Sequence, residues 1–209
     1  MTARHGKRWP GLDHERQFAR SGCVAIAGID EAGRGAWAGP VVAGAVILNL
    51  AKARSLRKVT DSKQLSPRQR EALYPRIVEA SLAYGIGLAD PDEIDAIGVV
   101  PATRQAMRRA IDVLSMRPDA LIIDAVRLPD VELPQSAFNF ADSISLSVAA
   151  ASILAKVRRD RMMIDLAATF PGYGFERHKG YGTPAHRQAL QDIGTCAAHR
   201  KTFRPMRET

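Results

Sequence analysis

Acidic residues stand at the ends of apolar segments in this sequence. Asp30 and Glu31 follow one short apolar run, Asp124 follows another, and Asp142 comes just before a long alanine-rich segment. Grouped carboxylates are unfavourable, because like charges raise one another's pKa and resist ionisation. Mg²⁺ and Mn²⁺ offset that cost, since oxygen atoms are their preferred ligands. The pattern predicts a site for two divalent metal ions, which is suited to hydrolysis of a phosphodiester.

Each of these acids also has a simpler interpretation. Asp142 before Ser143 is an ordinary helix N-cap signal, and Asp124 at the end of a strand can merely shape a turn. The Asp30–Glu31 pair is harder to explain in this way, because adjacent acids seldom follow a buried strand without a partner. Neighbouring strand residues point to opposite faces of a sheet. Both acids can therefore serve one site only if the strand ends before them.

Two further segments carry residue types that suit an anionic ligand. In the Gly33-Arg34-Gly35 turn, backbone N–H groups can meet an anion and Arg34 can bond a phosphate through two donors. Residues 178–182 (HKGYG) combine cations with the ring of Tyr181, which could stack on a base or a sugar. A tight hairpin and an ordinary surface loop are the simpler alternatives. The glycine spacing fits neither a dinucleotide fingerprint nor a P-loop.

Apolar runs and helix-start signals indicate the elements that would position these residues. Strands are predicted at 23–29, 41–48, 83–88 and 120–123, and the first two are expected to pair as an antiparallel hairpin. Ser66 followed by Pro67 predicts a helix that begins there and runs to about residue 80. Further helices are predicted at 92–96, at 102–114, at 143–167 and from Pro184 onward. The alternation predicts a mixed α/β layered domain.

Length and composition limit the class of protein. The 209 residues suit a single domain, with a polar, partly helical lead-in at 1–21 and a C-terminal segment at about 168–209. Thirty Lys+Arg against 22 Asp+Glu give a net charge of +8, which favours a polyanionic partner such as nucleic acid, although it also serves solubility alone.

The lack of targeting signals and the small number of cysteines favour a reducing compartment. No apolar run reaches the ~18 residues of a membrane-spanning helix, and the N-terminus lacks the apolar region of a signal peptide. The two cysteines form neither a zinc spacing nor a disulfide framework. We therefore expect no membrane association, a cytoplasmic location and, by default, a monomer.

Several segments, in order along the chain, resemble sequence blocks of the bacterial ribonuclease HII family. They are residues 28–35 (GIDEAGRG) continued by 38–42, then 61–66 (DSKQLS), 149–160, 178–183 (HKGYGT) and 199–203. The match extends from about residue 22 to residue 205 and covers nearly the whole chain. One such block can arise by chance, whereas five in order are highly specific.

The resemblance implies a ribonuclease H-like fold, an α/β arrangement with a mixed central sheet flanked by helices and a small C-terminal helical portion. It implies an endoribonuclease that hydrolyses the RNA strand of RNA–DNA hybrids and incises 5′ to ribonucleotides embedded in duplex DNA, leaving 3′-hydroxyl and 5′-phosphate ends. By the same resemblance, two Mg²⁺ or Mn²⁺ ions would be held by Asp30, Glu31, Asp124 and Asp142.

The resemblance also implies contacts with the substrate. The Gly33-Arg34-Gly35 turn would contact the ribonucleotide at an RNA–DNA junction, where the 2′-hydroxyl distinguishes RNA from DNA. Tyr181 would pack on the following deoxyribose, and Ser62 and Lys63 would touch the nucleic-acid backbone. The C-terminal segment would thus contact substrate through Tyr181.

Two positions depart from the family's pattern, and two other functions stay open. The family often has glycine after the third acid and before the fourth, where this chain has Ala125 and Ala141. Both acids are present, so the implied metal site stands. A non-catalytic nucleic-acid-binding protein would have little use for four repelling carboxylates. The turn at 33–35 together with Tyr181 argues against another nuclease of this fold, such as a junction resolvase.

Overall fold

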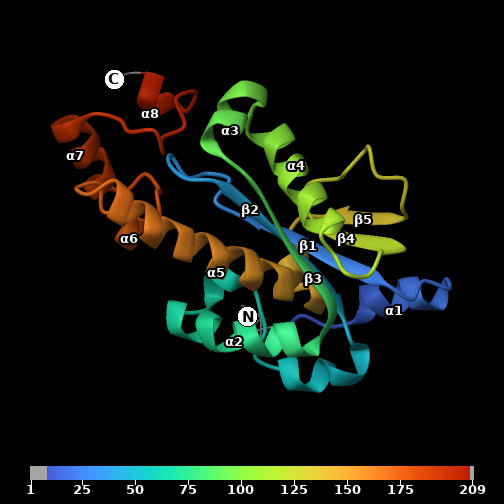
Figure 1. Cartoon of the computed structure of the whole chain (residues 1–209). Coiled ribbons are helices and arrows are strands. Elements are labelled where there is room, and N and C mark those ends of the chain that lie inside the picture. The colour runs from blue at the N-terminus through green and yellow to red at the C-terminus, as the bar shows by residue number, and fades with distance from the viewer. Residues whose placement is uncertain (1–8, 208–209) are drawn as a thin grey trace, which may run out of the picture.

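The computed structural model describes residues 9–207, which form a five-stranded sheet between two layers of helices (Figure 1). The strands are β1 (Ile26–Ala32), β2 (Val41–Leu48), β3 (Ser81–Ala89), β4 (Ala120–Asp124) and β5 (Gln135–Phe138). Their order in the sheet is β3-β2-β1-β4-β5. β2 pairs antiparallel with both β1 and β3, while β4 pairs parallel with both β1 and β5. The sheet is therefore mixed, as predicted.

The helices cover both faces of the sheet and extend beyond one end of it (Figure 1). They are α1 (Asp13–Arg20), α2 (Pro67–Ala80), α3 (Pro91–Ile97), α4 (Val99–Asp112), α5 (Leu146–Thr169), α6 (Phe175–His178), α7 (Pro184–Ile193) and α8 (Arg204–Arg207). Short 3-10 helices lie at Leu50–Leu56, Ser62–Gln64 and Ala141–Ser143. Within residues 9–207, no helix has the length and apolar character needed to cross a membrane.

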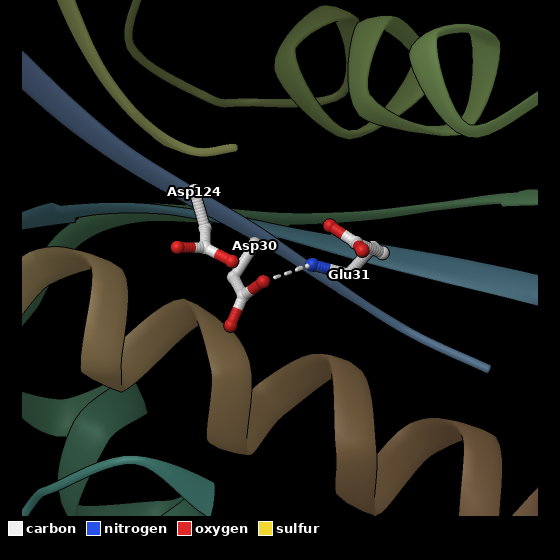
Figure 2. A group of neighbouring side chains, drawn as sticks. All are labelled: Asp30, Glu31 and Asp124. Carbon is white, nitrogen blue, oxygen red and sulfur yellow. Dashed lines mark hydrogen bonds between the residues drawn. The ribbon is translucent and has the colours of Figure 1, made fainter. Parts of the chain in front are cut away.

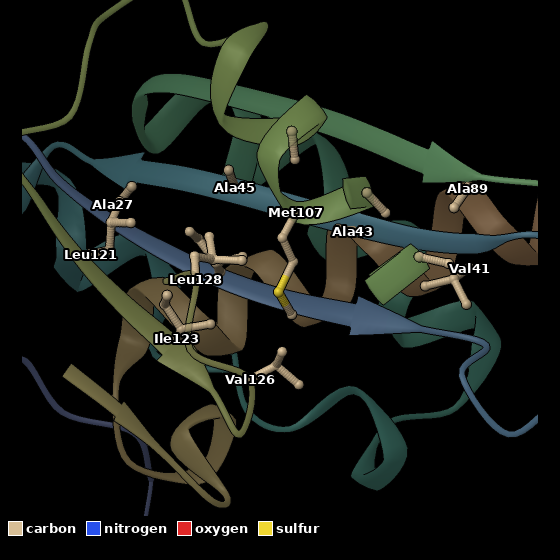
Figure 3. Close-up of a cluster of buried hydrophobic side chains, with 14 of the residues drawn as sticks. Ala27, Val41, Ala43, Ala45, Ala89, Met107, Leu121, Ile123, Val126 and Leu128 are labelled. Carbon is tan, nitrogen blue, oxygen red and sulfur yellow. The ribbon is translucent and has the colours of Figure 1, made fainter. Parts of the chain in front are cut away.

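The main core lies between the sheet and α4. Alternate residues of β1, β2 and β4 meet Ala106, Met107 and Ala110 of α4 in one buried cluster, part of which Figure 3 shows. Alternation follows from the strand period of two, which sends successive side chains to opposite faces. The same faces of β1 and β4 carry Ile29 and Ile123, the residues just before the acids. This core therefore fixes the strand ends that bear the carboxylates.

The opposite face of the sheet packs against α5, with α2 alongside. The alanine-rich part of α5 approaches the strands closely: a Cβ at Gly44 would lie 2.6 Å from the carbonyl oxygen of Ala151. At Gly28 a Cβ would lie 2.3 Å from the backbone of Ser147. Leu73 and Ile77 of α2 pack in one buried cluster with residues of α5 and β2. Small residues on the helix and on the strands thus permit this close packing.

Several predicted boundaries hold and others need correction. α2 begins at Pro67 with Ser66 as N-cap and a capping box to Gln69, as predicted. The prediction that the first strand ends at Ile29 is wrong, because β1 continues to Ala32. Helix α5 begins at Leu146 and is capped by Ser145, so the N-cap interpretation of Asp142 is also wrong.

Other elements were not predicted or were shifted. β5 was not predicted, and α4 starts three residues earlier than the predicted 102–114 helix. In the lead-in at 1–21, α1 confirms the partly helical prediction, while residues 1–8 lie outside the described part of the chain.

The C-terminal portion packs around a chain of hydrogen bonds between buried side chains. Nδ1 of His186 donates to the carbonyl of Tyr181 at 3.0 Å, which leaves its Nε2 to accept from Nε2 of His199, also at 3.0 Å. Nδ1 of His199 in turn accepts from the N–H of Cys196. Burial, with His178 and His199 close by, lowers the pKa of His186 to about 4. Both rings of this pair are therefore neutral in the folded protein at neutral pH.

Replacing His186 by glutamine should flatten the dependence of stability on pH. Glutamine keeps a donor and an acceptor but takes up no proton. Between about pH 6.5, the usual histidine pKa, and about pH 4, residue 186 of the wild type is protonated in the unfolded chain but neutral in the folded protein. Wild-type stability therefore falls as the pH drops through that window. Denaturant unfolding of both proteins across it measures the difference, because the other titratable groups are common to both. A difference that stays constant with pH would contradict the neutral pair.

Candidate active site

The parallel pairing of β1 with β4 brings two carboxylates to the same edge of the sheet. The last paired residues are Ile29 and Ile123, and Asp30 and Asp124 come next on their strands. Figure 2 shows their carboxylates converging above α5, with Glu31 beside them. One oxygen from each of Asp30, Glu31 and Asp124 lies within 4.8 Å of the other two. Three of the four predicted ligands therefore form one group.

Asp30 and Glu31 share this site although both lie inside a strand. Asp30 lies on the face of β1 that packs against α5, and Glu31 lies on the other face. The pairing of β1 with β4 stops at Ile29, so this edge of β1 is free of β4 beside both acids. The longer Glu31 side chain can reach round that edge toward Asp30. The prediction that β1 must end before both acids was therefore wrong. It is sufficient that the neighbouring strand β4 stops pairing with β1 there.

The electrostatics of the group favour a bound cation. Asp30 is 4% exposed, and burial together with Glu31, Asp124 and Asp142 raises its pKa well above the usual value. Burial also raises the pKa of Glu31, although Arg34 opposes that shift. Oε2 of Glu31 is buried and has no hydrogen-bond partner among the described residues. An unpaired carboxylate oxygen among other carboxylates fits a divalent cation better than any side chain present.

Asp142 lies beside the group of three. Its Oδ2 is 3.6 Å from Nζ of Lys63, and its side chain is almost fully buried. Burial and the neighbouring Asp61 raise the pKa of Asp142 to about 6, with Lys63 opposing the shift. The N–H of Ala141 donates to Oδ1 of Asp124 at 2.7 Å, which ties the segment before Asp142 to the end of β4. The fourth predicted acid is therefore anchored to the site.

Lys63 and Ser62 occupy different environments. Lys63 has a largely exposed side chain and, although partial burial acts the other way, Asp142 and Asp61 raise its pKa. Ser62 is buried, its N–H donates to Ser152, and its carbonyl accepts from Arg70. Lys63 can therefore meet an anion beside the carboxylates, while the visible contacts of Ser62 are internal. Sequence reasoning missed Asp61, which caps this short segment.

The glycine–arginine turn (residues 33–35) and the tyrosine loop (residues 178–182) lie against each other. Arg34 and Gly35 are exposed, and Arg34 forms an ion pair of 3.2 Å with Glu31. The N–H of Trp37 donates to the carbonyl of Gly180 at 2.8 Å, which joins the tyrosine loop to the chain two residues after the turn. Tyr181 is half-buried, with Nζ of Lys156 5.5 Å from the centre of its ring. The structure therefore brings both predicted substrate-contacting segments to one surface next to the acids.

Two buried arginines support this surface, and sequence reasoning did not single them out. Arg159 and Arg200 are fully buried, and their guanidinium groups donate to backbone carbonyls of residues 33–40 and of Lys179. Arg159 lies on α5, and Arg200 follows α7. An arginine is expected at the surface, because it is rarely buried without an acidic partner. Nothing in the local sequence distinguishes these two from surface arginines.

The mixed sheet, the carboxylates on neighbouring strands and the flanking helices define a metal-dependent nuclease of the ribonuclease H-like class. The sequence model of the family Ribonuclease HII matches residues 27–206. A ribonuclease HII of Chloroflexus aurantiacus is 52% identical over 202 residues, which is 95% of this chain and 95% of the relative. This chain belongs to the ribonuclease HII family, whose members are endoribonucleases that act on RNA–DNA hybrids.

Solved structures agree with this assignment. Ribonuclease H2 from Pyrococcus horikoshii OT3 is similar with a TM-score of 0.74 and 29% identity, over 88% of this chain and 96% of that one. Bst-RNase HIII, solved in complex with Mn²⁺, has a TM-score of 0.64 and 22% identity, over 88% of this chain and 68% of that one. The second likeness is one of fold.

The residue after Asp124 bears strain that glycine would relieve. Ala125 has φ of 55°, in the left-handed region that L-residues adopt at a cost, and its side chain is exposed. Ala125→Gly should raise the free energy of unfolding by about 1 kcal/mol, or the Tm by roughly 2–4 °C. Ala72→Gly, at an exposed position inside α2, is the matched control and should lower stability by about 0.5–1 kcal/mol. Equal losses in both variants would contradict the strain at Ala125.

Proposed function

We propose that this chain hydrolyses the RNA strand of RNA–DNA hybrids and incises 5′ to ribonucleotides embedded in duplex DNA, giving 3′-hydroxyl and 5′-phosphate ends. The observation that carries the proposal is the carboxylate group lying directly beside the glycine–arginine turn. Glu31 belongs to that group, and its ion pair with Arg34 links it to the turn. A site that joins acid ligands to an exposed anion-binding turn suits cleavage of a phosphodiester that the turn selects.

Asp30, Glu31, Asp124 and Asp142 would hold two divalent cations, Mg²⁺ or Mn²⁺. The unpartnered Oε2 of Glu31 supports this, and so do the pKa values of Asp30, Glu31 and Asp142, which burial and neighbouring acids raise. A divalent cation would offset both effects. When bound, such ions supply Lewis acidity that activates water and neutralises charge developing on the phosphate. The chain's own contribution is to orient the carboxylates, as the Ala141 N–H does for Asp124.

The remaining polar residues would bind and orient the substrate. Arg34 and the backbone of Gly33 and Gly35 contact the ribonucleotide, and the ring of Tyr181 packs on the deoxyribose that follows. Lys63 approaches a backbone phosphate, a role supported by its exposed ammonium group beside Asp142. Ser62, whose N–H and carbonyl are bonded internally, would touch the same backbone through its hydroxyl group.

The molecule as a whole fits this role as one catalytic domain. The segment from about 168 onward contributes the tyrosine loop to the substrate surface, and the net charge of +8 suits a duplex partner. We further propose that the protein acts as a monomer in the cytoplasm.

Asp124→Asn should abolish cleavage of a duplex carrying one ribonucleotide while leaving binding of that duplex measurable. The loss should exceed the roughly 10–100-fold effect of removing a group that only orients a metal ligand. Cleavage of an end-labelled duplex, mapped to the nucleotide, measures activity, and a gel-shift titration measures binding. Asp130→Asn, at an exposed acid away from the site, is the control and should cleave like wild type. Full activity of Asp124→Asn would refute the metal-site assignment.

The same duplex tests the metal requirement of the unaltered protein. A chelator should remove all cleavage, and adding Mg²⁺ or Mn²⁺ in excess should restore it. Cleavage that persists in chelator would contradict the proposed cofactors.

Arg34→Ala and Tyr181→Ala should weaken selection of the RNA–DNA junction more than overall affinity. Each removes a group that faces the sugar on either side of the scissile region, whereas general affinity comes from many phosphate contacts. The measurement is the ratio of kcat/KM for the single-ribonucleotide duplex to that for a uniform RNA–DNA hybrid. Arg117→Ala, exposed at the other end of β4, is the control. An equal loss on both substrates would contradict the assigned roles.

A further inference from the structure

Arg200 is buried beneath the glycine–arginine turn, and its guanidinium group donates hydrogen bonds to carbonyls of the turn and of Gly39. Its Nη2 donates to the carbonyl of Gly33 at 2.7 Å, its Nη1 to the carbonyl of Arg34 at 2.9 Å, and its Nε and Nη2 to the carbonyl of Gly39 at 3.0 and 2.8 Å. Its exposure is 0%, and no acidic side chain within residues 9–207 forms an ion pair with it.

Such a group is costly to bury. An ionised side chain away from water needs compensation from hydrogen bonds or an opposite charge. Burial, with Arg159 close by, lowers the pKa of Arg200 to about 9, so the guanidinium is still charged at neutral pH. Four hydrogen bonds to carbonyls of one segment provide the compensation. The charge is therefore tied to the position of that segment.

The direction of these carbonyls fixes the direction of the neighbouring N–H groups. In a trans peptide the C=O and the following N–H point opposite ways. The structure has no cis peptide bonds among the described residues. Because the carbonyls of Gly33 and Arg34 point inward to Arg200, the N–H groups of Arg34 and Gly35 point outward. Both residues are exposed, and neither N–H donates to the backbone anywhere in residues 9–207.

Arg159 holds the residues that follow the turn and contacts the turn itself at Gly33. It donates to the carbonyls of Ala38 and Pro40 and to that of Lys179 in the tyrosine loop, at 2.9 to 3.0 Å. Gly33 rests on this guanidinium, since a Cβ there would lie 1.9 Å from Nε of Arg159. The turn thus lies on two buried cations and has little freedom to rotate its peptides.

We propose that Arg200 is a positioning residue for sugar selection, which holds the N–H groups of Arg34 and Gly35 as two fixed outward donors for the 2′-hydroxyl oxygen of a ribonucleotide. The inference rests on the proposed function of the turn. Donors that are already oriented lose little freedom when the ligand binds. A cation bonded to the carbonyl also polarises the peptide and strengthens its N–H as a donor.

The planar guanidinium is essential to this role. Three carbonyls are reached by one rigid fork of N–H groups, whereas the lysine ammonium is a compact point charge with three donors. Arg200→Lys therefore keeps the positive charge but loses the simultaneous contacts to Gly33, Arg34 and Gly39. This substitution separates geometry from charge.

Equilibrium binding of two duplexes tests the proposal without relying on catalysis. One duplex is all DNA, and the other carries a single ribonucleotide, both measured in an Asp124→Asn background that prevents cleavage. The protein with Arg200 intact should bind the ribonucleotide duplex more tightly than the all-DNA duplex. Arg200→Lys should lower that preference about tenfold, the effect of losing one or two hydrogen bonds, while affinity for all-DNA duplex stays unchanged. Arg117→Lys, at an exposed arginine remote from the turn, should keep the full preference.

A second variant removes a donor without touching Arg200, in case Arg200→Lys does not fold. Gly35→Pro deletes the outward N–H, and nothing lies within 4 Å of a Cβ at this position. It should lose the same preference for the ribonucleotide duplex. An unchanged preference in Arg200→Lys, or a parallel loss of affinity for both duplexes, overturns the role of Arg200. An unchanged preference in Gly35→Pro overturns the N–H of Gly35 as a donor to the ribonucleotide, and with it the proposal. A protein with Arg200 intact that shows no preference would instead refute the proposed function of the turn.

Discussion

Mutual repulsion among the carboxylates at the ends of β1 and β4 is the constraint on which the rest of this structure depends. Burial and the neighbouring acids raise the pKa of Asp30, so an apolar fold must hold charged groups where they are least stable. Packing provides the necessary rigidity, with Ile29 and Ile123 in the core immediately before the acids and α5 against the opposite face of the sheet. The site is thus a strained arrangement that a divalent cation would relax.

Buried positive charge behind the glycine–arginine turn complements this negative centre. Arg159 and Arg200 satisfy their donors with carbonyls and have no ion pairs with acids among the described residues, so they do not neutralise the carboxylates directly. Their effect is on the backbone: they fix the segment that continues from β1 into β2. The protein therefore uses its acids for a metal centre and its buried cations for the shape of the adjoining surface.

Sequence alone predicted the local features well, because local signals determine them. Ser66 and Pro67 gave the start of α2, and the apolar run at 41–48 matched β2. One local prediction failed, because Ser145, three positions later, replaces Asp142 as the cap of α5. Other predictions failed where a distant segment decides: Glu31 reaches the site because the neighbouring strand stops. The arginine contacts could not be predicted, since Arg200 meets carbonyls more than 160 positions earlier in the chain.

The same strand carries the metal ligands and leads into the turn proposed to select the sugar. Glu31 and Arg34 are three positions apart and form an ion pair, so the turn begins directly after the carboxylate group and contacts it. The residues just after the turn are bonded to the tyrosine loop through Trp37 and Gly180. An error in the position of the sugar would then be an error in the position of the phosphate relative to Asp30 and Asp124. On this geometry, selecting a ribonucleotide and aligning its phosphodiester both depend on the position of the turn. This accounts for the burial of two charged arginines, Arg159 and Arg200, beneath it.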